Sequence, residues 1–155
     1  AFDVNTYIKD FLKGVTPIFE EKEITLIYDE VDFTAVADRK QMSTVISNIV
    51  LNACSHTKDE KIIKISAEQA DDFIKIKVFN TGSKIEDKDK DGIFTSFYRA
   101  DKAHSRKEGR FGLGLSIVKS IIDNHGCECG FENKENGVEF WFTMKLAPQN
   151  TETEG

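Results

Sequence analysis

The chain has 155 residues, of which 39% are hydrophobic and 31% are charged, and this length and composition fit one globular domain. Its apolar runs are only a few residues long, which excludes a transmembrane helix, and no signal peptide is expected. The net charge of −6 argues against nucleic acid or an anionic membrane as a partner. Three cysteines are typical of a reducing compartment rather than of a disulfide framework. Because the chain starts without Met, we expect a processed chain or an excised fragment.

The first half of the chain predicts a helix, two short strands and a second helix. Asp3 is a candidate N-cap, and apolar residues at helical spacing follow it up to Pro17, which we expect to end or kink the helix. Short strands are expected at Ile24–Tyr28 and Thr34–Ala37. The clearest helix comes next, because its apolar residues recur at i, i+3, i+4, i+7, i+8 and i+11: Met42, Val45, Ile46, Ile49, Val50 and Ala53.

The second half predicts two hairpins, separated by a long polar stretch and a helix. Strands are expected at 62–67 and 73–79, and a closing hairpin at Asn136–Gly137. Residues 86–111 lack a clear pattern, and such long irregular stretches are usually functional or mobile. The helical period returns at Leu113 and stops at His125–Gly126. This order predicts one α/β domain over residues 1–146, a two-layer α/β sandwich with a mixed sheet and helices on one face, followed by a disordered tail at 147–155.

Two carboxamide side chains, Asn48 and Asn52, lie four residues apart on the second predicted helix. This spacing places them on one side of the helix at the edge of its apolar face, in a stripe with Gln41 and Ser55. A solvated helix flank would explain a polar stripe alone. Asn is however a poor helix former, so two of them reduce stability unless they have a role. Amide oxygens are suitable Mg²⁺ ligands when phosphate groups supply the negative charge.

Two glycine motifs are candidate ligand sites. Asn80-Thr81-Gly82 ends a predicted strand, where such a sequence is usually a turn. Beneath a pocket, Asn80 could instead hydrogen-bond the edge of a heterocycle, and Gly82 would let a ligand approach closely. The run from Gly109 to Leu115 opens the last helix, where backbone N–H groups and the helix dipole attract an anion, although a hinge would also need glycine. It matches neither a Walker A loop nor a convincing dinucleotide fingerprint.

Charge and cysteine patterns give two further candidates. Between Arg99 and Arg110 there are five cations and two acids, which fits a solvated face or, beside a glycine-rich helix start, a clamp for a triphosphate. The run His125, Cys127, Cys129 could bind a soft metal, but no second cluster completes a tetrahedral site. We therefore expect these side chains to be structural.

Taken in chain order, these features resemble the catalytic, ATP-binding domain of sensor histidine kinases, in the superfamily shared with gyrase B, Hsp90 and MutL. The resemblance covers about residues 3–146. Four segments carry it: residues 38–57 resemble the N box, 78–85 the first glycine box, 93–99 the F box and 111–118 the second glycine box.

The resemblance implies a role for each matching residue. Asn52 would coordinate Mg²⁺, Asn80 would face the adenine amine, and Arg99 would bind the γ-phosphate and support its transfer. Residues 86–111 would form a lid over ATP. The catalytic residues it implies are Arg99 and Asn52, and the cofactor-binding residues are Asn48, Asn52, His56, Asn80, Gly82, Ile85, Arg99, Lys102, Gly112, Leu113, Gly114 and Leu115.

Several positions depart from the family pattern. Asn80 stands where Asp is usual, which removes the charge assistance from a hydrogen bond to adenine. Lys84 and Arg110 replace glycines, and Ser55-His56 replaces a Lys-Tyr pair that often follows the N box. These departures predict a modest ATP affinity.

The resemblance thus implies a protein-histidine kinase module that binds Mg²⁺–ATP. It would transfer the γ-phosphoryl to a histidine on a separate dimerisation domain of the same kinase, and so act indirectly on a response regulator. None of the three histidines lies in a phosphoacceptor motif, so the fragment, expected to be monomeric, should not phosphorylate itself. A cytoplasmic domain of a membrane-anchored sensor is the implied location.

Two alternatives remain open. The first is another member of the superfamily, such as an anti-sigma serine kinase or an ATPase. The ATPases use a Glu on the N-box helix to activate water, and no acid lies between Arg39 and Lys58, which argues against hydrolysis. The second is a degenerate module that binds nucleotide without catalysis. Calorimetric titration of ATP and ADP, with and without Mg²⁺, separates this second alternative from the enzymes.

The lid hypothesis gives a first prediction. Residues 86–111 have few large apolar anchors, so local opening of this stretch without nucleotide should require little free energy. We expect its amide hydrogen exchange to slow when a non-hydrolysable ATP analogue is added. Equal exchange with and without the analogue would contradict a lid.

Overall fold

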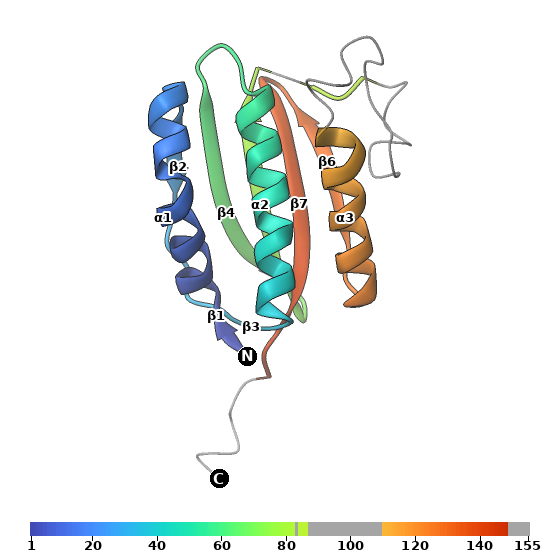
Figure 1. The fold of residues 1–155 in the computed structure, drawn as a ribbon. Coiled ribbons are helices and arrows are strands. Elements are labelled where there is room, and N and C mark those ends of the chain that lie inside the picture. Colours follow the sequence, from blue (N-terminus) through green and yellow to red (C-terminus); the bar gives the residue numbers. More distant parts are fainter. Residues whose placement is uncertain (83, 87–109, 149–155) are drawn as a thin grey trace.

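The computed structural model describes residues 1–82, 84–86 and 110–148 of the chain. In this part, three helices lie side by side on one face of a mixed sheet (Figure 1). The predicted two-layer α/β sandwich with helices on one face is therefore confirmed. The helices are α1 (Val4–Lys22), α2 (Arg39–His56) and α3 (Arg110–Asn124).

The sheet of the described residues has the strand order β1-β3-β7-β5-β4-β2, and β6 also pairs with β7. The β2–β4 pair is parallel and the other pairs are antiparallel. Asn80 pairs with both Ile63 and Val138 in neighbouring strands, so the end of β5 lies inside the sheet and not at its edge. The strands are β1 (Phe2–Asp3), β2 (Thr25–Tyr28), β3 (Thr34–Val36), β4 (Ile62–Ala70), β5 (Phe73–Thr81), β6 (Cys129–Lys134) and β7 (Gly137–Leu146).

The hydrophobic core lies between the helices and the sheet. Alternate residues of the central strands are buried because successive side chains of a strand point to opposite faces. The apolar stripe predicted on α2 meets them and is buried along its whole length, so this helix cannot rotate without exposing core residues. The core residues on these elements include Met42, Val45, Ile46, Ile49, Ile74, Ile76, Val78, Phe140, Phe142 and Met144.

Helix α1 begins as predicted but does not end as predicted. The Asp3 carboxylate accepts a hydrogen bond from the Thr6 backbone N–H at 2.8 Å, which confirms the N-cap. The expectation that the helix ends at Pro17 is wrong, because α1 continues to Lys22. Pro17 removes one backbone hydrogen bond, but Val15 and Phe19 on either side of it are buried, and this packing holds both parts in one helix.

Other boundaries also differ from the sequence-based expectations. Helix α3 begins at Arg110, three residues before Leu113, and β4 and β5 each extend beyond the predicted strands. Strand β1 was not predicted, because a two-residue strand leaves no pattern. Of the expected tail, residues 149–155 lie outside the described part of the chain. None of the described helices is long and apolar enough to cross a membrane.

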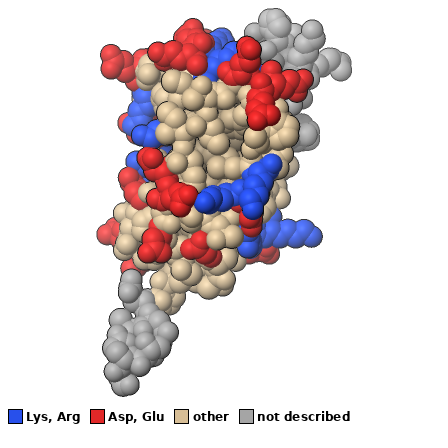
Figure 2. All heavy atoms as spheres, turned by 90° about the vertical axis from the view of Figure 1, so that its left-hand side faces the viewer, with Lys and Arg blue, Asp and Glu red and all other residues tan. Residues whose placement is uncertain are grey.

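The face formed around α1 is strongly charged in places. Figure 2 shows acidic side chains gathered toward the upper end of this side of the molecule, where α1 ends with the exposed Glu20, Glu21 and Glu23. Lys and Arg side chains form a separate group lower on the same face (Figure 2). An anionic partner would therefore meet repulsion at the C-terminal end of α1.

Candidate functional site

The polar stripe of α2 is exposed at its two ends and buried between them. Gln41 and Ser55 are exposed and Asn48 is half-buried, whereas Asn52 is only 2% exposed. The side-chain oxygen Oδ1 of Asn52 has no hydrogen-bond partner in the part of the chain that the structure describes. A buried acceptor left without a partner costs about 1–3 kcal/mol. This oxygen is therefore available to a ligand or a metal ion.

The end of β5 places a second buried amide near the first. Asn80 is 1% exposed, and its Nδ2 donates a hydrogen bond to the Thr81 carbonyl at 3.2 Å. It lies within a strand, so the simple turn considered from the sequence is wrong. Ile76, Val78 and Asn80 are buried at every second position of β5. The Asn80 side chain therefore points to the same helix-covered face of the sheet as the other two.

Thr81 connects β5 to the segment that follows α2. Its hydroxyl donates to the Lys58 carbonyl at 2.9 Å and accepts from the Ile62 N–H at 3.0 Å. Its carbonyl accepts from the Lys58 N–H at 2.9 Å and from the Thr57 hydroxyl at 3.2 Å. These bonds fix the C-terminal end of α2, which carries Asn52, against the end of β5, which carries Asn80.

Gly82 makes this close approach possible. It has a positive φ of 88°, and a Cβ at this position would lie 2.6 Å from the Lys58 carbonyl oxygen. Both the backbone conformation and the lack of space therefore require glycine here. This is a steric role in addition to the ligand approach predicted from the sequence.

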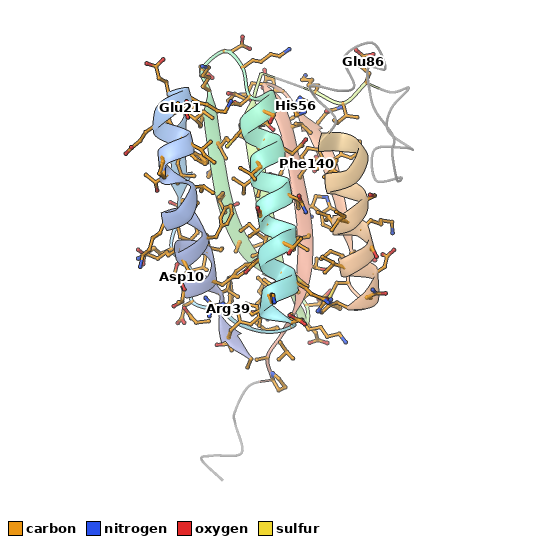
Figure 3. All side chains as sticks on the ribbon, in the orientation of Figure 1. Asp10, Glu21, Arg39, His56, Glu86 and Phe140 are labelled. Carbon is orange, nitrogen blue, oxygen red and sulfur yellow. The ribbon has the colours of Figure 1, made fainter. Side chains whose placement is uncertain are left out.

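A cavity of about 240 Å³ opens between these elements. Figure 3 shows His56 near the C-terminal end of α2 and Phe140 on the strand behind it, between α2 and α3. The cavity is lined by two amide side chains, a histidine, two exposed lysines, a glycine and three apolar side chains. The lining residues are Asn52, His56, Lys58, Asn80, Gly82, Lys84, Ile85, Val138 and Phe140.

The start of α3 lies close to the polar stripe of α2. A Cβ on Gly114 would lie 3.5 Å from the Asn48 Oδ1, so α3 lies close to α2 at this point. Gly112 falls in the first turn of α3, where N–H groups lack partners within the helix and remain available to an anion. Leu115, which was predicted to bind cofactor, has a fully buried side chain in the hydrophobic core.

Part of the predicted site lies outside the described residues. Arg99, Lys102 and the segment resembling the F box belong to residues 87–109. Of the other predicted residues, the structure brings Asn52, His56, Asn80, Gly82 and Ile85 into one cavity. Asn48 and Gly114 do not line this cavity but lie close to each other where α2 and α3 meet.

The sequence interpretation missed several residues of the site. One missed group is the hydrogen-bonded contact that Thr81 makes with Thr57 and Lys58, here called the joint. The other is the pair of apolar residues of β7 that line the cavity, Val138 and Phe140. Thr57 and Thr81 lie inside the segments that resemble the N box and the first glycine box, but neither motif indicated the hydrogen bonding of the joint. The strand alternation of β7 could have indicated that Val138 and Phe140 face the helices.

Two side chains of the His-x-Cys-x-Cys run make hydrogen bonds within the fold. His125 Nε2 accepts from the Asp38 backbone N–H at 3.2 Å, and the Cys127 thiol donates to the His125 carbonyl at 3.5 Å. Burial raises the pKa of the Cys129 thiol to about 11, so without a metal ion this side chain is a neutral thiol at pH 7. Among the described residues, no group of three or more His, Cys, Asp and Glu could hold a metal ion.

Comparison with known proteins gives one consistent result. The model of the family "Histidine kinase-, DNA gyrase B-, and HSP90-like ATPase" matches residues 37–148. The chain is 36% identical over 116 residues to the sensor protein VanSB of Enterococcus faecalis, covering 75% of this chain and 26% of VanSB. It is 37% identical over 123 residues to the sensor protein VanS of Enterococcus faecium, covering 79% of this chain and 32% of VanS. The chain thus spans about a quarter to a third of these relatives.

Solved structures agree in fold and extent. The nucleotide-free catalytic domain of the histidine kinase ThkA superposes with a TM-score of 0.82 at 32% identity, covering 96% of this chain and 97% of that domain. A structure of ThkA in complex with the response regulator TrrA gives a TM-score of 0.79 at 30% identity, covering 96% of this chain and 42% of that one.

The joint at Gly82 gives a second prediction. We expect Gly82→Ala to destabilise the fold by about 2–4 kcal/mol, because the new Cβ meets the Lys58 backbone at a positive φ. Gly14→Ala is the matched control: it lies in α1 with no atom within 4 Å of a new Cβ, and should stabilise the helix by about 0.5–1 kcal/mol. Urea unfolding of both variants measures this, and an unchanged midpoint for Gly82→Ala would contradict the steric role.

Proposed function

This chain belongs to the family of histidine kinase-, DNA gyrase B- and HSP90-like ATPases, as a catalytic domain of the histidine kinase type, and we propose how it acts. It binds Mg²⁺–ATP in the cavity between α2, β5 and β7. It then delivers the γ-phosphoryl group to a histidine on a dimerisation domain of the same full-length kinase.

The observation that carries this proposal is the buried Asn52 Oδ1 without a hydrogen-bond partner among the described residues. A neutral amide oxygen of this kind fits Mg²⁺, which prefers oxygen ligands and takes much of its charge compensation from phosphates. When bound, the ion neutralises charge on the phosphate groups. Asn48, one helical turn earlier and half-buried, would lie on the phosphate side of the same site.

The apolar part of the cavity lining suits a purine base. Ile85, Val138 and Phe140 supply an apolar wall, and the buried Asn80 amide supplies a polar group at the edge of a base. Such a combination of apolar walls and few polar groups is typical of small-molecule sites. Gly82 also lines the cavity. Because it has no side chain, a ligand could approach its backbone closely.

Catalysis would rest on positioning and charge neutralisation rather than on a base from α2. This helix carries no acidic side chain that could activate water, which favours transfer over hydrolysis. We assign Arg99 and Lys102, which lie outside the described residues, to the γ-phosphate on the resemblance of their segment to the F box. The backbone around Gly112 would hold phosphates at the start of α3.

The partners of the whole kinase are part of the proposal. The similar kinase ThkA forms a complex with a response regulator, and we infer a response regulator as the indirect partner here. The relatives VanS and VanSB are sensor proteins. We therefore infer that this domain works inside the cell as part of a membrane-anchored sensor.

The metal role of Asn52 can be tested directly. We expect Asn52→Ala to nearly abolish the Mg²⁺-dependent part of ATP binding, measured by titration calorimetry with and without Mg²⁺. Its stability should change by only about 1 kcal/mol, since the lost oxygen makes no hydrogen bond in the described structure. Gln41→Ala, an exposed amide on the same helix, should leave both affinities unchanged. Wild-type Mg²⁺–ATP affinity in Asn52→Ala would remove the metal role.

Recognition of the base by Asn80 gives a further prediction. Asn80→Asp should raise the preference for ATP over GTP by up to about tenfold, since a carboxylate accepts more strongly from the adenine amine and repels the guanine carbonyl. The substitution also removes the bond from Nδ2 to the Thr81 carbonyl, which would affect both nucleotides alike. The ratio of the two affinities is therefore the quantity to measure, and a parallel change in both would refute adenine recognition by this residue.

A further inference from the structure

The side chain of Asn133, on β6, holds the backbone of Ile85 with both groups of its amide. The Ile85 N–H donates to Asn133 Oδ1 at 2.9 Å, and Asn133 Nδ2 donates to the Ile85 carbonyl at 2.9 Å. The two residues are 48 positions apart in sequence. One side chain thus satisfies the donor and the acceptor of Ile85 as a neighbouring strand would.

Ile85 needs this support because it belongs to no helix or strand of the described chain. Its side chain is nevertheless only 7% exposed and lines the cavity assigned to ATP. The hairpin of β6 and β7 also accepts the Gly82 N–H at the Asn136 carbonyl, at 2.9 Å. Gly82 and Ile85 are therefore each hydrogen-bonded to this hairpin.

Asn133 also stands beside the apolar wall of the cavity. It pairs with Val138 across the hairpin, and paired residues of neighbouring strands share one face of a sheet. Val138 and Ile85 both line the cavity. The Asn133 amide thus fixes the spacing between Val138 and Ile85, two apolar residues of the cavity.

We propose that Asn133 is a positioning residue of the nucleotide site, which holds Ile85 as the wall against the adenine base. This inference rests on the proposed function. Without the two hydrogen bonds, the segment must be ordered when the ligand binds, and the affinity falls by that ordering free energy. Because the contact is with the base, the effect must be independent of Mg²⁺ and of the phosphates.

The test compares Asn133→Ala with Asn136→Ala, an exposed Asn of the same hairpin whose backbone carbonyl is kept. For Asn133→Ala we expect adenosine, ADP and ATP to bind about three- to tenfold more weakly, each by the same factor. The ratio of ATP affinities with and without Mg²⁺ should stay as in the wild type. Amide exchange at Ile85 should accelerate. Asn136→Ala should behave as the wild type in every measurement.

Asn133→Asp provides a second variant that keeps one acceptor for the Ile85 N–H but sets a carboxylate oxygen against the Ile85 carbonyl. It should weaken all three ligands as well. Wild-type affinities in both Asn133 variants, a loss confined to ATP, or an equal loss in Asn136→Ala would overturn the inference. A wild-type chain that binds neither ATP nor ADP would instead refute the proposed function.

Discussion

The arrangement of the whole site depends on the hydrogen bonds between Thr81 and the segment just after α2. The Thr81 hydroxyl both donates and accepts, and its carbonyl accepts three further bonds, from Lys58, Thr57 and Asn80. Most of these groups are buried or half-buried, where an unmade bond is expensive. The joint therefore tolerates little movement, and the amides of Asn52 and Asn80 keep a fixed spacing although they come from a helix and a strand.

The same region contains a group that folding alone leaves unsatisfied. Asn52 Oδ1 is buried without a hydrogen-bond partner among the described residues, next to a joint in which nearly every polar group is paired. An apolar residue at this position would stabilise the free protein. An amide here is understandable if a ligand supplies the missing partner, since the free energy not gained in folding is then gained in binding.

The sequence predicted those features that repeat at short range. The period of α2 placed Asn52 correctly at the edge of the buried face, because such a pattern reports one face of one element. The alternation of β5 identified the strand but ended it at Phe79, two residues before its end at Thr81. The end of α1 was predicted wrongly at Pro17, because burial of Val15 and Phe19 outweighs the helix-breaking tendency of proline. The joint at Thr81 and the amide of Asn133 could not be predicted, since they depend on contacts between residues about 20 and 48 positions apart.

Burial also determines where charged side chains lie around the cavity. Its two deepest polar residues, Asn52 and Asn80, are neutral, and its lysines, Lys58 and Lys84, are exposed. A charge at either deep position would have to be desolvated before any ligand arrived, whereas cations at the rim keep their hydration. In the proposed complex, a triphosphate would bring its own counter-ion to Asn52, because the buried amide supplies an oxygen but no charge. Metal and nucleotide should consequently bind as one unit, with the base held by neutral contacts that do not depend on the metal.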